Sequence, residues 1–252
     1  MPVLVQFIFR LSFGMALAMA CTPSRLVTSG YFRVHLYVLL GLNTLAALIA
    51  LGAPDDFELW PPLAAAGLSY IGSVFWLYEK PTPGKAALLL VSAIAACGAL
   101  LADEGIRTTA LSSSQLLRWL DPITSGLVLG TTIAAMLLGH WYLNTPTMQL
   151  EPLKRLVVLM GLAVILRCLV SGAGTVLEVS ASGIPEHSQL AFIALRWLSG
   201  IVGTLILARM TWQTLKIPNT QSATGILYVA VIATFLGELT SQLLSRESTF
   251  PL

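Results

Sequence analysis

Long apolar runs, separated by short polar breaks, follow one another along the whole chain. Each run is close to the roughly 20 residues that a helix needs to cross a hydrocarbon core about 30 Å thick. In lipid a backbone segment must satisfy its own hydrogen bonds, so each run is predicted to be an α-helix. The pattern predicts eight membrane-spanning helices, over residues 3–21, 32–51, 62–78, 85–102, 115–143, 153–174, 189–215 and 223–245.

The breaks between these runs are short and contain proline and glycine, as in the turn Pro81-Thr82-Pro83-Gly84. None of them is long enough to fold as a soluble domain, so the sequence predicts a single transmembrane domain over residues 1–252. The first run ends in Ala18-Met19-Ala20-Cys21, which is similar to a cleavable signal. Because Arg10 interrupts that run, we expect a retained first helix instead.

Composition supports the same fold class. Hydrophobic residues make up 56% of the chain and charged residues 10%, whereas a soluble domain carries about 25% charged residues. A transmembrane β-barrel is disfavoured, because its strands alternate in character over segments of about ten residues. We therefore expect an all-α protein, a polytopic helical bundle in contact with the lipid bilayer. A net charge of +2 without a Lys/Arg block argues against a nucleic-acid partner.

The two ends of the predicted helices differ in charge. One end collects the basic residues Arg25, Arg33, Lys80, Lys85, Lys154, Arg155, Arg209 and Lys216. The other end collects Asp55, Asp56, Glu58, Asp103, Glu104, Glu178, Glu186 and Glu247, together with Arg107, Arg118 and Arg246. The positive-inside rule makes the basic end cytoplasmic. We therefore expect a multi-pass protein of the cell inner membrane with both termini outward, in the periplasm.

Four ionisable residues, Arg10, Arg167, Arg196 and Glu238, fall well inside the predicted spans. Charges there are costly and usually face the bundle interior or a wet cavity. Each lies about seven residues from the acidic end of its span, which places all four roughly 10 Å below the outer face. Asp121, near the start of the fifth span, can reach the same layer.

This charged layer has two interpretations. In the first, ion pairs such as Glu238 with one arginine hold the helices together. In the second, the layer is a ligand pocket open to the outer half of the membrane. Three arginines outnumber the carboxylate of Glu238, and a surplus guanidinium binds an anion or a carbonyl oxygen. The predicted ligand-binding residues are Arg10, Arg167, Arg196, Glu238 and Asp121, and quinone is the candidate ligand.

Two histidines share a depth near the basic end. His35 lies one turn into the second span, and His140 lies one turn before the end of the fifth. A matched pair on two helices could ligate the iron of a b-type haem or bind a quinone carbonyl. Alternatively, they are interfacial histidines in an aromatic belt with Tyr37, Trp141 and Tyr142.

Two short segments carry a resemblance to a known family. They are Leu195-Arg196-Trp197, which opens the seventh span, and Phe235-Leu236-Gly237-Glu238-Leu239 in the eighth. Through these residues the last two spans resemble the end of the eight-helix membrane anchor subunits of the DMSO-reductase and NrfD type. The resemblance implies short loops, a partner that carries an iron–sulfur and molybdenum-type redox arm, and oxidation or reduction of quinone at the membrane.

The resulting expectation is a membrane subunit of a respiratory-type electron-transfer complex, which binds quinone and b-type haem and works with other protein subunits. Its own role would be non-catalytic or quinone-reactive, because the sequence contains no GxSxG, HExxH or P-loop motif. One alternative is a small anion transporter or channel that uses the buried arginines as selectivity charges. Another is a structural or assembly subunit without a ligand.

Overall fold

The structure, a computed structural model, describes residues 2–53, 58–102, 113–145, 147–183, 187–217, 219–246, 248 and 250–252. Within these residues every regular element is a helix and there is no strand, which confirms the predicted all-α bundle. Several charged residues of the predicted outer end lie outside the described residues. These are Asp55, Asp56, Asp103, Glu104, Arg107, Glu186 and Glu247.

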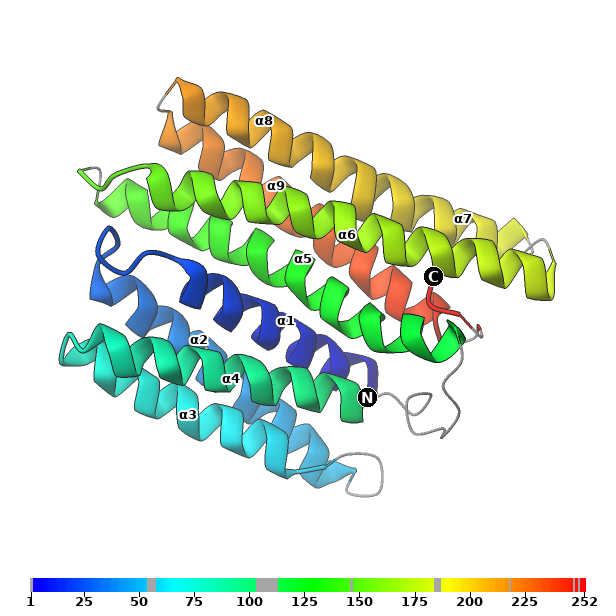
Figure 1. Ribbon diagram of the computed structural model, residues 1–252, viewed down its shortest axis with the longest axis horizontal. Helices are drawn as coiled ribbons and strands as arrows, with labels where there is room; N and C mark the ends of the chain where they lie inside the picture. The colour runs from blue at the N-terminus through cyan, green and yellow to red at the C-terminus, as the bar shows by residue number, and fades with distance from the viewer. Residues whose placement is uncertain are drawn as a thin grey trace.

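The helices run side by side and alternate in direction (Figure 1). They are α1 (Pro2–Cys21), α2 (Ser29–Gly52), α3 (Trp60–Leu77), α4 (Pro81–Leu101), α5 (Ser113–Asn144), α6 (Glu151–Ser182), α7 (His187–Leu195), the π-helix η2 (Arg196–Gly203), α8 (Thr204–Lys216) and α9 (Thr220–Leu244). Because α7, η2 and α8 follow without a break, the described chain forms eight rods, one for each predicted span.

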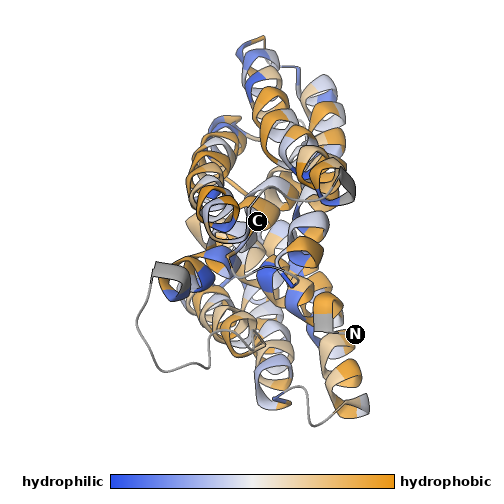
Figure 2. Cartoon of the chain, turned by 90° about the vertical axis from the view of Figure 1, so that its right-hand side faces the viewer, coloured by the Kyte–Doolittle hydropathy of each residue, from blue (hydrophilic) through white to orange (hydrophobic). Residues whose placement is uncertain are grey.

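Seven of these rods, in the described part of the chain, are long and apolar enough to cross a membrane. The remaining rod is α3, which packs between α2 and α4. Lipid-facing side chains are large and apolar, as at Leu48, Leu169 and Ile232, which are 61%, 66% and 68% exposed. Such exposure suits hydrocarbon and not water, so the chain is a multi-pass membrane protein. Figure 2 shows that hydrophobic residues predominate along most of the helices.

The bundle consists of two groups of four rods, α1–α4 and α5–α9, which meet where α1 packs against α5. These two helices form the centre. Within the most hydrophobic stretch of each of these two helices, 72% of the residues are buried. The corresponding share for the rod of α7, η2 and α8 is 22%. The first helix is therefore part of the core of the bundle, and its retention in the mature protein stays a prediction.

Glycines make the contact between α1 and α5 very close. A Cβ added to Gly14 would overlap the backbone of Gly126, and one added to Gly130 would overlap the backbone of Gly14. A Cβ on Gly126 would lie 2.6 Å from the carbonyl oxygen of Arg10. Gly126 and Gly130 form a small-xxx-small motif, which allows helix backbones to touch in a membrane. This contact sets Arg10 beside α5.

Three features differ from the sequence prediction. Pro81 and Pro83 do not form a turn but lie in the first turn of α4, where the missing amide hydrogens cost nothing. Helix α6 continues to Ser182, eight residues beyond the predicted end at position 174. The seventh span contains the π-helix η2 at Arg196–Gly203, which the apolar pattern did not indicate.

The turns that carry the basic residues all lie at the end of the bundle opposite both described chain ends (Figure 1). They join α1 to α2, α3 to α4, α5 to α6 and α8 to α9. The eight basic residues that the sequence assigns to one end therefore lie toward the same end of the structure. The cytoplasmic assignment of the basic end stays a prediction.

Candidate functional site

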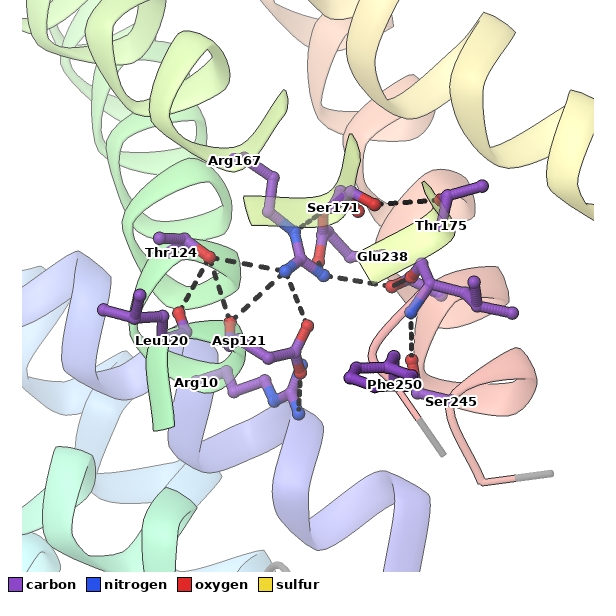
Figure 3. Close-up of polar contacts among 12 residues, drawn as sticks. Arg10, Leu120, Asp121, Thr124, Arg167, Ser171, Thr175, Glu238, Ser245 and Phe250 are labelled. Carbon is purple, nitrogen blue, oxygen red and sulfur yellow. Dashed lines mark hydrogen bonds and ion pairs between the residues drawn. The ribbon is translucent and has the colours of Figure 1, made fainter. Parts of the chain in front are cut away.

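A buried chain of alternating charges crosses the bundle, with Arg167 of α6 at its centre (Figure 3). The guanidinium of Arg167 donates to both carboxylate oxygens of Glu238, from Nε to Oε1 and from Nη2 to Oε2, each at 2.9 Å. Its Nη1 donates to Oδ1 of Asp121 at 2.6 Å. A planar guanidinium suits two-point pairing with a carboxylate, so this arrangement fixes α6 against α9.

Asp121 of α5 connects the two groups of helices. Its Oδ1 accepts from Arg167, while its Oδ2 forms an ion pair with Nη2 of Arg10 at 2.8 Å. The resulting order is Arg10, Asp121, Arg167, Glu238, and these residues come from α1, α5, α6 and α9. The prediction that charges from distant segments meet in one layer is confirmed for these four residues.

Two hydroxyl groups also accept hydrogen bonds from the guanidinium of Arg167. Thr124 accepts a hydrogen bond from Nη1 at 3.3 Å, and Ser241 accepts one from Nη2 at 3.0 Å. Thr124 follows Asp121 by three residues and Ser241 follows Glu238 by three, so each shares a helix face with its carboxylate. Sequence reasoning missed both hydroxyls, although this spacing of polar residues beside a deep carboxylate was the available signal.

The last described residues close one side of this cluster. Ser241 donates to the backbone carbonyl of Leu252, the backbone N–H of Phe250 donates to Glu178 at 2.8 Å, and the N–H of Leu252 donates to Ser245 at 3.0 Å. Gly174 permits this approach, because a Cβ there would overlap the carbonyl oxygen of Pro251. The chain therefore returns between α6 and α9, an arrangement that the apolar pattern does not predict.

Arg196 lies in the same layer, but its guanidinium is not part of the chain of ion pairs. Its side chain is 1% exposed, yet within the described residues none of its three guanidinium nitrogens has a hydrogen-bond partner. It begins the π-helix η2, a rare conformation that often occurs at functional sites. Nε and Nη1 of Arg10 also lack partners in the described part of the chain.

A second glycine contact positions Arg196. A Cβ on Gly200 of η2 would lie 2.8 Å from the Cα of Gly237, and a Cβ on Gly237 would lie 3.4 Å from the carbonyl oxygen of Arg196. Since Glu238 follows Gly237 directly, this contact brings the backbones of η2 and α9 together at the level of the charge layer. Arg196 is therefore held next to the cluster by backbone packing and not by an ion pair of its own.

The five ionisable side chains of the layer carry a surplus of positive charge. Arg10, Arg167 and Arg196 provide three guanidinium groups, whereas Asp121 and Glu238 provide two carboxylates, which leaves one positive charge. All five side chains are at most 3% exposed. A buried charge without a partner is costly, so this layer has unused capacity to bind an anion or an electron-rich oxygen. The predicted opening of this layer to the outer half of the membrane stays a prediction.

The two histidines lie at the basic end but face different neighbours. The Nδ1 atom of His35 is 2.6 Å from the carbonyl oxygen of Tyr31, and the ring packs against Tyr31 and Trp141. The exposed His140 is directed to Tyr228 of α9, with Nδ1 3.2 Å from the hydroxyl. The described side chains therefore do not pair the two imidazoles. The ring of Trp141 lies beside His35 instead. To bind one haem iron together, His35 and His140 would both have to change their side-chain orientation.

No group of three or more metal-ligating side chains occurs among the residues that the structure describes. Comparison of the chain with known protein families, with curated proteins and with solved structures gives no match. The resemblance to redox membrane anchors consequently rests on the residues of the last two spans alone.

Proposed function

We propose that this chain is a membrane subunit of an electron-transfer complex, and that its buried arginine layer binds the headgroup of a quinone. The observation that carries the proposal is Arg196, a buried guanidinium with no hydrogen-bond partner among the described residues. In this proposal Arg196 donates to a quinone carbonyl oxygen. Such a bond offsets the cost of burying the unpaired charge, which amounts to several kcal/mol for an isolated ion.

The chemistry of quinone suits a layer with one surplus positive charge. When a quinone is reduced, negative charge develops on its oxygens, and a fixed guanidinium in a water-poor site stabilises that charge. Quinones dissolve in the hydrocarbon core and can enter between helices. The Asp121 and Glu238 carboxylates are occupied by Arg10 and Arg167. They therefore hold the layer in place and leave the donors of Arg196 for the ligand.

A partner subunit is part of this proposal. The described chain is almost entirely transmembrane helix, with short connections between the rods. Electrons would have to reach the quinone from a separate redox protein, in keeping with the resemblance of the last two spans to membrane anchors. A b-type haem at His35 and His140 is a further element of the proposal, and it requires the two imidazoles to turn toward one iron.

The experiment is a titration of the purified protein with short-chain ubiquinone and menaquinone analogues, followed by quenching of tryptophan fluorescence. We expect saturable binding by the natural sequence. Arg196→Met should weaken it by at least tenfold, since a hydrogen bond from a charged donor contributes about 1.5–3 kcal/mol. Arg33→Met removes a charge at the basic end of α2 and should leave binding unchanged. Absence of saturable binding, or equal binding by Arg196→Met, would refute the proposal.

A second candidate is passage of a small anion, which the same surplus charge favours. Here Arg10 and Arg196, both with unpartnered nitrogens in the described residues, would act as selectivity charges. Liposomes that contain the purified protein should then release chloride or nitrate when a gradient is imposed. Anion flux that depends on Arg196, without quinone binding, would favour this candidate over the first.

A further inference from the structure

An open groove runs along the membrane-facing side of the second helix group, between α6 and α8. Its volume is about 430 Å³, within the range of about 300–1,000 Å³ that is usual for ligand pockets. Val158 and Gly161 line it from α6, and Leu205 and Ile206 line it from α8. The space beside Gly161 is empty, since a Cβ added there would meet no atom within 4 Å. The groove therefore has the shape and the apolar walls that suit a hydrocarbon chain.

The groove becomes polar toward the basic end of the bundle. Arg209 and Trp212 line it there, and both side chains are exposed. Arg209 lies seven residues before the end of α8 at Lys216, or roughly 10 Å along the helix axis. A long arginine side chain at that depth extends its charged group toward the headgroup region, and tryptophan is enriched at that level.

Two further cations extend the same face. Lys154 precedes Val157 and Val158 by one helical turn on α6, and Lys216 follows Trp212 by one turn on α8. In the described part of the chain, Lys154, Arg209 and Lys216 take part in no ion pair, whereas the adjacent Arg155 is paired with Glu151 at 2.9 Å. This end of the groove thus presents positive charge that the described protein does not neutralise.

We propose that the groove between α6 and α8 binds an anionic phospholipid from the leaflet at the basic end of the bundle. One acyl chain lies along Gly161, and the phosphate is bound by Arg209 with Lys154 and Lys216 nearby. Charge complementarity selects this occupant, because basic pockets between transmembrane helices bind anionic headgroups. A zwitterionic lipid brings a second cation with its phosphate and so adds no net negative charge, and a quinone tail would leave the three cations unpaired.

The test measures lipid retained by the purified protein. The protein in detergent is offered phosphatidylglycerol and phosphatidylcholine with identical acyl chains, and the bound lipid is counted by native mass spectrometry. We expect phosphatidylglycerol to bind at least tenfold more tightly than phosphatidylcholine. Arg209→Gln should remove most of this preference. Arg25→Gln, which removes an exposed charge in the turn between α1 and α2, should keep it.

A second variant tests the apolar part of the groove. Gly161→Leu puts a bulky side chain into the groove from a position where the added Cβ meets no atom within 4 Å, so the bundle should fold with an unchanged melting temperature and lose bound lipid. Phosphatidylglycerol that carries brominated acyl chains should quench Trp212, and Trp212→Phe should remove that part of the quenching. Equal binding of the two lipids, or retention of phosphatidylglycerol by both Arg209→Gln and Gly161→Leu, would overturn the proposal.

Discussion

Arg167 donates to both carboxylate oxygens of Glu238, although the two residues lie 71 positions apart in the sequence. Arg196 is buried to the same degree, but within the described residues its guanidinium donates to no group. The two arginines therefore differ in what they contribute to the folded protein. Arg167 stabilises the contact between α6, α5 and α9, while Arg196 adds a desolvation cost without a compensating bond.

This difference predicts opposite effects on stability. Arg167→Met should destabilise the protein by about 3–5 kcal/mol, because it leaves Glu238 without its ion-pair partner and leaves Asp121 paired with Arg10 alone. Arg196→Met should be neutral or stabilising, because it removes a buried charge that lacks a partner. Unfolding of the purified protein by dodecyl sulfate in mixed micelles measures both changes. Equal destabilisation by the two variants would contradict the assignment of Arg196 as the free donor.

The pair of Arg167 and Glu238 should show strong coupling in a double-mutant cycle. Glu238→Leu alone removes both acceptors and should cost about 3–5 kcal/mol. Combined with Arg167→Met, it should cost clearly less than the sum of the two single changes, by about 0.5–3 kcal/mol. Additive effects would mean that the pair does not form in the membrane.

The glycine contact between α1 and α5 should tolerate no side chain. Gly130→Ala places a methyl group inside the backbone of Gly14, so the helices must separate, at a cost of about 1–3 kcal/mol or more. Gly225→Ala in α9 is the matched control, since a Cβ there meets nothing within 4 Å. The midpoint of thermal unfolding in detergent should fall for the first variant and stay constant for the second.

If the histidines bind a b-type haem, the purified protein should show a Soret band. Replacement of His35 or His140 by Ala should then abolish that band while the protein still inserts into the membrane. The visible spectrum of each purified variant gives the answer. A natural protein without the band, or a band that survives both substitutions, would remove haem from the proposed function.

Topology can be tested with a reporter that is active only in the periplasm. Fusion after Leu252 should give activity, and insertion at Thr82, in the first turn of α4, should not. The expectation follows from the basic residues at the end of the bundle that contains Thr82. The reverse pattern of activity would mean that the basic end faces outward.

Much of the helical architecture could be predicted from the sequence, because apolar runs of membrane-spanning length leave few alternatives to helices. The meeting of Arg10, Arg167 and Glu238 was predicted in part from the tendency of charges inside a membrane to face the interior of the bundle. The predicted depth of Arg167 was wrong, because it was counted from a span end at position 174 and α6 continues for eight more residues to Ser182. Its true level is fixed by its partners on α5 and α9, not by its distance from the end of α6.

Other features depend on contacts that no local pattern reports. The π-helix η2 has an apolar sequence that suits an α-helix equally well, and it is associated with the close contact of Gly200 with Gly237. No sequence pattern indicates that Arg196 lacks a hydrogen-bond partner among the described residues while Arg167 pairs with both Asp121 and Glu238. The groove between α6 and α8 arises from the spacing of two consecutive rods, which the apolar pattern of each rod does not report.

The ion pair between Arg10 and Asp121 has a consequence for synthesis of the protein. A ribosome makes Asp121 only after 121 minus 10, or 111, further residues. At about 5–20 residues per second this takes about 6 to 22 s. Until then the carboxylate that pairs with Arg10 does not exist. The glycine contact of α1 and the ion pair of Arg10 both depend on α5, so neither can form before that helix has been made.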